Sequence, residues 1–80
     1  MLVIASRPII VEWTTGPDET PCSAIVLSGT VGEVNGPVYE DDRWKVAVTW
    51  NEALVTTIPM GGIRRDYAMD VDPHDITIVR

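Results

Sequence analysis

The segment that most constrains the fold is residues 44–50, WKVAVTW. Two tryptophans and two valines stand at every second position, with Lys45, Ala47 and Thr49 between them. A period of two is typical of a half-buried β-strand, because successive side chains point to opposite faces of the sheet. The segment therefore predicts an all-β domain, and the alternation places both tryptophans mainly in the core.

The length and composition indicate one small globular domain. The chain has 80 residues, 45% of them hydrophobic, and no phenylalanine, so tryptophan, tyrosine, valine and isoleucine must fill the core. We expect a single domain over residues 1–80, with its core formed by about residues 9–79. A domain of this size buries only about 60% of the surface of its unfolded chain, which predicts a small stability margin.

The other expected strands are short runs rich in β-branched residues. They are residues 9–14, 23–34, 53–58 and 76–79, which together with residues 44–50 make five strands. Gly29 and Gly32 lie within the second of them and predict a bulge or a sharp bend. Residues 44–58 are expected to form a hairpin through a short connection at Asn51 and Glu52.

Irregular segments are expected between these strands. They are residues 14–21, 35–43 and 60–75, which contain most of the proline, glycine and aspartate of the chain. Pro21 and Pro37 favour loops, and Pro59 should end the fourth strand because it has no N–H to donate. Asp72 as a cap and Pro73 at the first helical position predict one helical turn before the last strand.

This order of elements resembles the SH3-like small barrels, which include SH3, Tudor and KOW-type domains. The matching segments are SGTVGEV (residues 28–34), KVAVTW (45–50) followed by VTTIP (55–59), and DPHDITIV (72–79). The resemblance implies a five-stranded, strongly bent antiparallel sheet or an SH3-like barrel. The residues with which SH3 domains bind proline-rich peptides have no counterpart here, so such ligands are not expected.

The charge is negative and unevenly distributed. Residues 33–42 and residues 66–75 each contain four acidic residues and no arginine or lysine, and the net charge is −6. Residues 43–65, between them, carry four basic residues against Glu52 alone. Such a chain repels phosphate backbones, so direct binding of nucleic acid is not expected. A protein partner with a basic surface is favoured, because opposite fields speed encounter.

Two acidic and aromatic patches are the candidate partner-binding site. The first is Tyr39, Glu40, Asp41 and Asp42, and the second is Asp66, Tyr67 and Asp70. Both tyrosines are expected to be exposed in loops, where aromatic side chains often anchor interfaces. The three adjacent carboxylates can pair with arginine or lysine of a partner or imitate a nucleic-acid backbone. The alternative is a loop that is merely solvated.

Other sites are less well supported. Trp13 and Trp44 with Trp50 and the two tyrosines could form a cage for methylated side chains, as in some SH3-like domains. A cluster of carboxylates near His74 lacks the spacing of a calcium loop, and a glycine pair before Arg64 and Arg65 is more typical of a turn than of a phosphate site. The lone cysteine, Cys22, excludes an internal disulfide and is expected to be buried. We expect no catalytic residue, metal or cofactor.

These observations favour a non-catalytic binding protein that docks an acidic and aromatic surface on a basic partner. In size and charge the chain resembles phage-encoded inhibitors of host defence, anti-CRISPR proteins among them, which suggests an inhibitor that blocks a nucleic-acid-binding groove. The alternatives are an adaptor or accessory subunit, and a Tudor- or KOW-type module that recognises modified side chains or RNA. No signal peptide or membrane span is evident, so a cytoplasmic location is expected. The oligomeric state stays open.

Overall fold

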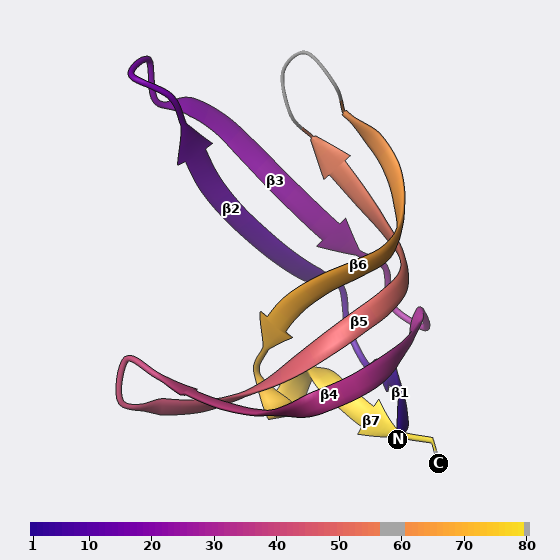
Figure 1. Ribbon diagram of the computed structural model, residues 1–80. Coiled ribbons are helices and arrows are strands. Elements are labelled where there is room, and N and C mark those ends of the chain that lie inside the picture. Colours follow the sequence, from indigo (N-terminus) through magenta and orange to yellow (C-terminus); the bar gives the residue numbers. More distant parts are fainter. Residues whose placement is uncertain (57–60, 80) are drawn as a thin grey trace.

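The computed structural model describes residues 1–56 and 61–79. In this part of the chain it contains seven strands and one short 3-10 helix (Figure 1). In chain order these are β1 (Leu2–Ala5), β2 (Ile9–Thr15), β3 (Thr20–Val26), β4 (Val31–Glu40), β5 (Arg43–Thr56), β6 (Gly62–Val71), η1 (Pro73–Asp75) and β7 (Ile76–Ile78). The predicted all-β class is confirmed, whereas the predicted number of five strands is wrong.

The strands form one antiparallel sheet that forks at β5. The strand order is β2-β3-β5-β4-β1-β7, and β6 pairs with β5 outside this path. Residues 46–50 of β5 lie between β4 and β6, and residues 54–55 lie between β3 and β6. Two branches, β3-β2 and β4-β1-β7, therefore leave the same side of β5 at different heights (Figure 1). In the described residues β2 and β7 do not pair with each other, so the sheet is not closed.

The expected hairpin over residues 44–58 is, as far as residue 56, the single long strand β5. The end of that hairpin and the predicted stop at Pro59 lie outside the described residues. Trp50 is buried, Asn51 and Glu52 are exposed, and Ala53 and Val55 are buried. Two successive exposed residues shift the alternation by one position without reversing the chain. This pair also lacks the glycine that favours a two-residue hairpin turn. Because of this shift, β5 buries even-numbered residues before it (Val48 and Trp50) and odd-numbered residues after it (Ala53 and Val55). One strand can therefore contribute core residues to both branches of the sheet.

The long strand expected over residues 23–34 is two strands, β3 and β4, joined by a turn at Leu27–Thr30. Gly29 has a φ of 88°, which suits a residue without a side chain, and the Thr30 N–H donates to the Leu27 carbonyl at 3.1 Å. Strand β1 holds the turn in place, because Ala5 accepts from Gly29 N–H and donates to the Thr30 carbonyl. The chain passes here from one branch of the sheet to the other without reversing, because β3 and β4 both run antiparallel to β5. The bend predicted at Gly29 is thus a turn between two strands rather than a bend within one strand.

Strands extend into two of the segments expected as loops, residues 35–43 and residues 14–21. Residues 35–40 belong to β4, with a bulge between Val34 and Gly36, and β3 begins at Thr20. Both Pro21 and Pro37 lie where their strand is paired on one side only among the described residues. A proline is tolerated there because its missing N–H can face away from the neighbouring strand.

Strands β1 and β6 were not expected from the sequence. In β1, Val3 and Ala5 are buried on one face and join the core, so the core also includes residues before residue 9. In β6, Tyr67, Met69 and Val71 alternate toward the core beside Val46, Val48 and Trp50 of β5. This alternation is present in the sequence, but the glycines and charged residues around it favour a loop.

The core lies between the two branches of the sheet. Its buried members are Val3, Ala5, Ile9, Ala24, Val26, Val48, Trp50, Ala53, Val55 and Val71. Trp50 is its largest fully buried side chain, and it lies opposite Gly32 in the β4–β5 register. The prediction that Trp50 is core is therefore confirmed. Cys22 is buried and free, as expected.

The predicted helical turn before the last strand is present as η1, Pro73–Asp75. The Asp72 side chain accepts a hydrogen bond from the His74 backbone N–H at 2.8 Å, and its other oxygen accepts from Arg43 at 2.9 Å. The backbone hydrogen bond, followed by the charges of His74 and Arg43, lowers the pKa of Asp72 below 3.8. Asp72 thus ties the turn to β5.

The charge of Asp72 should contribute to stability only above the pH at which it titrates. Because its pKa is lower in the folded protein, this contribution is complete above about pH 3.8 and is lost as the pH falls through the lower folded value. Asp72→Asn keeps a capping side chain without the charge. Denaturant titrations from pH 6 to pH 2 should therefore show a smaller loss of stability in this variant than in the wild type. Parallel curves would contradict this role.

Candidate functional site

The most prominent feature of the surface is a two-stranded arm formed by the adjoining ends of β4 and β5. We define the arm as residues 37–45, in which the two strands pair only with each other among the described residues. Its turn consists of Asp41 and Asp42, with φ of 53° and 60°. Positive φ at both central residues is required by the type I′ turn, whose twist matches that of the flanking strands. The arm extends away from the rest of the sheet (Figure 1).

Two aromatic side chains pack together on one face of the arm. Tyr39 lies opposite Trp44 in the register, and their ring centroids are 5.0 Å apart with the planes tilted by 59°. Tyr39 is 58% exposed, as expected, and Trp44 is 63% exposed. The prediction that Trp44 lies mainly in the core is therefore wrong. The alternation continues along β5, but at Trp44 none of the described strands covers that face.

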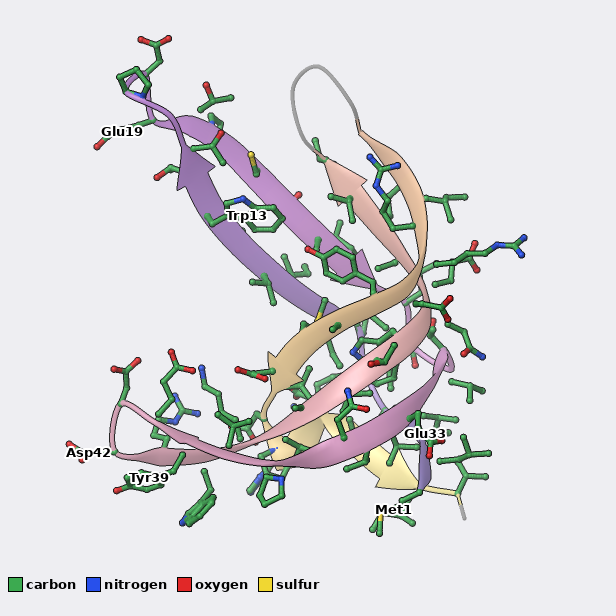
Figure 2. The ribbon with its side chains drawn as sticks, in the orientation of Figure 1. Met1, Trp13, Glu19, Glu33, Tyr39 and Asp42 are labelled. Atoms are coloured by element: carbon green, nitrogen blue, oxygen red, sulfur yellow. The ribbon has the colours of Figure 1, made fainter. Side chains whose placement is uncertain are left out.

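The acidic residues at the end of the arm are exposed to solvent. Glu40, Asp41 and Asp42 are exposed, and in the part of the chain that the structure describes none of them forms an ion pair. The nearest base in sequence, Arg43, donates instead to Asp72. Figure 2 shows Tyr39 and Asp42 near the free end of the arm, with Met1 and Glu33 at the opposite end of β4. The arm thus presents exposed aromatic rings beside carboxylates that no described arginine or lysine neutralises.

The second predicted patch is divided by the structure. Tyr67 and Asp70 of β6 line a groove of about 330 Å³, and Glu40 of the arm lines the same groove. Asp66 lies elsewhere, in a hollow that it shares with Asn51, Glu52 and Arg65. Tyr67 is half-buried against the core, so its expected exposure in a loop is wrong. Its place in β6, paired with Trp50, is the reason.

The aromatic residues do not assemble into one cage. Trp50 is buried, Trp13 and Tyr67 are half-buried at the β6 groove, and Tyr39 packs on Trp44 at the arm. The residues near His74 are also dispersed, and the described residues contain no group of three or more side chains that could hold a metal ion. Of the residues after the glycine pair, Arg64 and Arg65 lie in β6 rather than in a turn.

An apolar groove was missed by the sequence reasoning. It has a volume of about 440 Å³ and is lined by Met1, Val3, Val34, Pro37, Val46, Pro73, Ile76 and Ile78. Pro37 and Val46 are opposite each other, two residues from Tyr39 and Trp44, so the groove and the aromatic pair share one face of the arm. Its lining comes from both ends and from the middle of the chain, and no local pattern in the sequence could reveal it.

The fold and the site together define a class: a small, open, antiparallel β-sheet protein with a projecting acidic and aromatic hairpin. No family model, curated protein or solved structure matches the chain. Among the described residues, no helix has the length and apolar character to cross a membrane.

The turn of the arm offers a test of its geometry. Asp42 has a left-handed backbone conformation, which glycine adopts without steric cost and alanine does not. Asp42→Gly should therefore raise the free energy of unfolding by about 1 kcal/mol, whereas Asp42→Ala should lower it by a similar amount. Both variants remove the same charge, so opposite signs in urea denaturation would isolate the backbone. Equal shifts in both would exclude the left-handed turn.

Proposed function

We propose that this protein is a non-catalytic binding protein that docks its arm on a basic surface of a protein partner. The observation that carries the proposal is the exposed Tyr39–Trp44 pair beside three carboxylates that form no ion pair with any described residue. Aromatic side chains of this kind supply much of the affinity at protein interfaces. The carboxylates supply attraction over a longer range and raise the association rate.

The geometry of the arm supports this role. Cross-strand pairing holds the aromatic rings on one face, and the short turn leaves few conformations to be lost on binding. Docking of this kind serves an inhibitor that occupies a nucleic-acid-binding groove, and it equally serves an accessory subunit of a larger complex. A Tudor-type reader is the weaker proposal, because Tyr39 and Trp44 pack on each other and leave no slot for a cation between them.

The local negative potential can be measured through Trp44. It is the most exposed tryptophan, since Trp50 is buried and Trp13 is half-buried. We expect caesium ions to quench its fluorescence more effectively than iodide ions at low salt, because cations gather near the carboxylates. Converting Glu40, Asp41 and Asp42 to lysine should reverse that order. An unchanged order would show that these carboxylates set no local field.

The docking role is tested by affinity purification with quantitative mass spectrometry from the native host. We expect the partners of the wild type to be lost when Glu40, Asp41 and Asp42 are changed to lysine. The matched control changes the exposed Glu12, Asp18 and Glu19 to lysine. Both variants have zero net charge, since each replacement adds two charges to −6. Loss with the control as well, or retention with the arm variant, would reject the proposal.

Two further measurements separate the roles. Tyr39→Ser with Trp44→Ser should also abolish recovery of the partner, because it removes the apolar contact while keeping the charge. If the captured partner binds nucleic acid, adding the wild-type protein should displace that nucleic acid. Stoichiometric recovery of a stable complex whose nucleic-acid binding is unchanged would instead favour the accessory subunit.

A further inference from the structure

The outer edge of β6 is open to a further strand. Within residues 1–56 and 61–79, β6 pairs only with β5, and β2 pairs only with β3. The groove of about 330 Å³ lies between these two strands, lined by Val11 and Trp13 of β2 and by residues 67–70 of β6. An edge strand presents unpaired N–H and C=O groups, which makes it a template for another strand.

One half of this edge is protected against pairing and the other half is not. Residues 64–66 are Arg, Arg and Asp, and Asp66 has a left-handed φ of 51° that interrupts a regular ladder. Charged residues and irregular backbone are the usual means by which edge strands avoid pairing. Residues 67–71, Tyr-Ala-Met-Asp-Val, contain Asp70 as their one charged residue. The unprotected stretch is thus the part of β6 that borders the groove.

The two faces of the groove differ in chemistry. Tyr67 and Met69 lie on the core side of β6 and line the same groove as Trp13 of β2. Asp70 lies opposite Ala47 on the outer side, the side on which Lys45 and Glu40 also lie. Neither Asp70 nor Glu40 forms an ion pair among the described residues. A strand placed here would meet apolar surface on one face and two carboxylates with one lysine on the other.

We propose that the edge of β6 at residues 67–71 takes an extended segment of the partner as an added β-strand. This segment alternates apolar residues, which face Trp13, Tyr67 and Met69, with lysine or arginine, which face Glu40 and Asp70. Five residues of partner, about 17 Å of strand, match the open stretch. The inference deepens the proposed function and rests on it for the basic character of the partner. A second copy of this chain is a poor occupant, because each copy carries a net charge of −6.

The probe is a capped peptide of seven residues that alternates valine and lysine. Its binding to the full chain is measured by fluorescence titration, and hydrogen exchange of the protein's backbone amides is followed by NMR. We expect the exchange of outward-facing amides within residues 67–71 to slow on binding. The same peptide with alternate backbone nitrogens methylated should bind at least about tenfold more weakly, because it has lost two or three main-chain donors.

Protein variants separate this site from the arm. Asp70→Lys should weaken binding of the valine–lysine peptide about threefold. A peptide with glutamate in place of lysine should have its highest affinity for the Asp70→Lys variant, because the charges are then opposite. Trp44→Ser should leave the peptide affinity unchanged. The inference would be overturned if the peptide did not bind, or if the methylated peptide bound with equal affinity. It would also be overturned if binding protected only amides outside β6, or if a dimer protected β6 without peptide. If partner capture still depends on Tyr39 and Trp44, the proposed function stands without the added strand.

Discussion

Replacing Trp50 with alanine should lower the free energy of unfolding by about 3–5 kcal/mol, the range found for aromatic side chains deleted from cores. Trp50 is the largest fully buried side chain and lies at the bend of β5, where the two branches of the sheet meet. A domain of 80 residues has a total stability of roughly 4–12 kcal/mol. Trp50→Ala should therefore lower the melting temperature severely or leave the chain unfolded, as measured by circular dichroism.

The matched control is Trp44→Ala, in the same strand and on the same face. Trp44 is largely exposed and contacts Tyr39, so its loss should cost about 1 kcal/mol or less. Trp50→Phe gives a second control. The indole N–H of Trp50 has no hydrogen-bond partner among the described residues, so phenylalanine removes volume without breaking a bond. It should destabilise the protein less than alanine does. Similar losses for Trp44→Ala and Trp50→Ala would contradict the assignment of core and arm.

The second large effect is expected at Gly32. A Cβ atom at this position would lie 2.5 Å from Val48 Cγ1 and 2.7 Å from Trp50 Cε3. Glycine in a strand is ordinarily unfavourable by about 0.5–1 kcal/mol relative to alanine, which would make Gly32→Ala stabilising. The overlap outweighs this gain, because crowding a packed core costs about 1–3 kcal/mol. We expect a net loss of stability in urea denaturation and a melting temperature lower by about 4–8 °C for each kcal/mol.

A double-mutant cycle tests the cause. Val48→Ala removes the methyl group nearest to the new Cβ, at the cost of a cavity. The combined change at Gly32 and Val48 should therefore cost less than the sum of the two single changes. Strict additivity, or a stabilising Gly32→Ala, would show that Trp50 does not lie against the backbone of β4.

The predictable parts of the fold were those encoded locally. The alternation of residues 9–14 predicted β2, and Asp72 with Pro73 predicted the short helix before β7. The connection predicted at Asn51 and Glu52 is wrong because a long strand continues through them. A shift of alternation within one strand and a turn between two short strands can contain the same polar residues. The strand β6 was missed because it is stabilised by pairing with β5, and this pairing cannot be inferred from the residues of β6 alone.

The candidate site also contains residues that the sequence predicted correctly and residues that it did not. The acidic end of the arm, Glu40, Asp41 and Asp42, was predicted because a run of like charges must face solvent. Trp44 was assigned to the core because alternation reports which side chains share a face, and it does not report whether anything covers that face. Asp66 was grouped with Tyr67 by proximity in the chain, although successive residues of a strand point in opposite directions.

What the sequence determined alone is the all-β class, the shared face of Trp44 and Trp50 and the acidic surface, because period-two patterning and net charge are properties of the chain itself. What only the tertiary structure decided is which parts of the strands are packed or paired with other strands and which parts are exposed. Exposure of the Tyr39–Trp44 pair and of the edge of β6 depends on where β1 ends and which side of β5 each branch takes. These are contacts between residues distant in sequence, and the same side chain is core or binding surface according to whether such a contact forms.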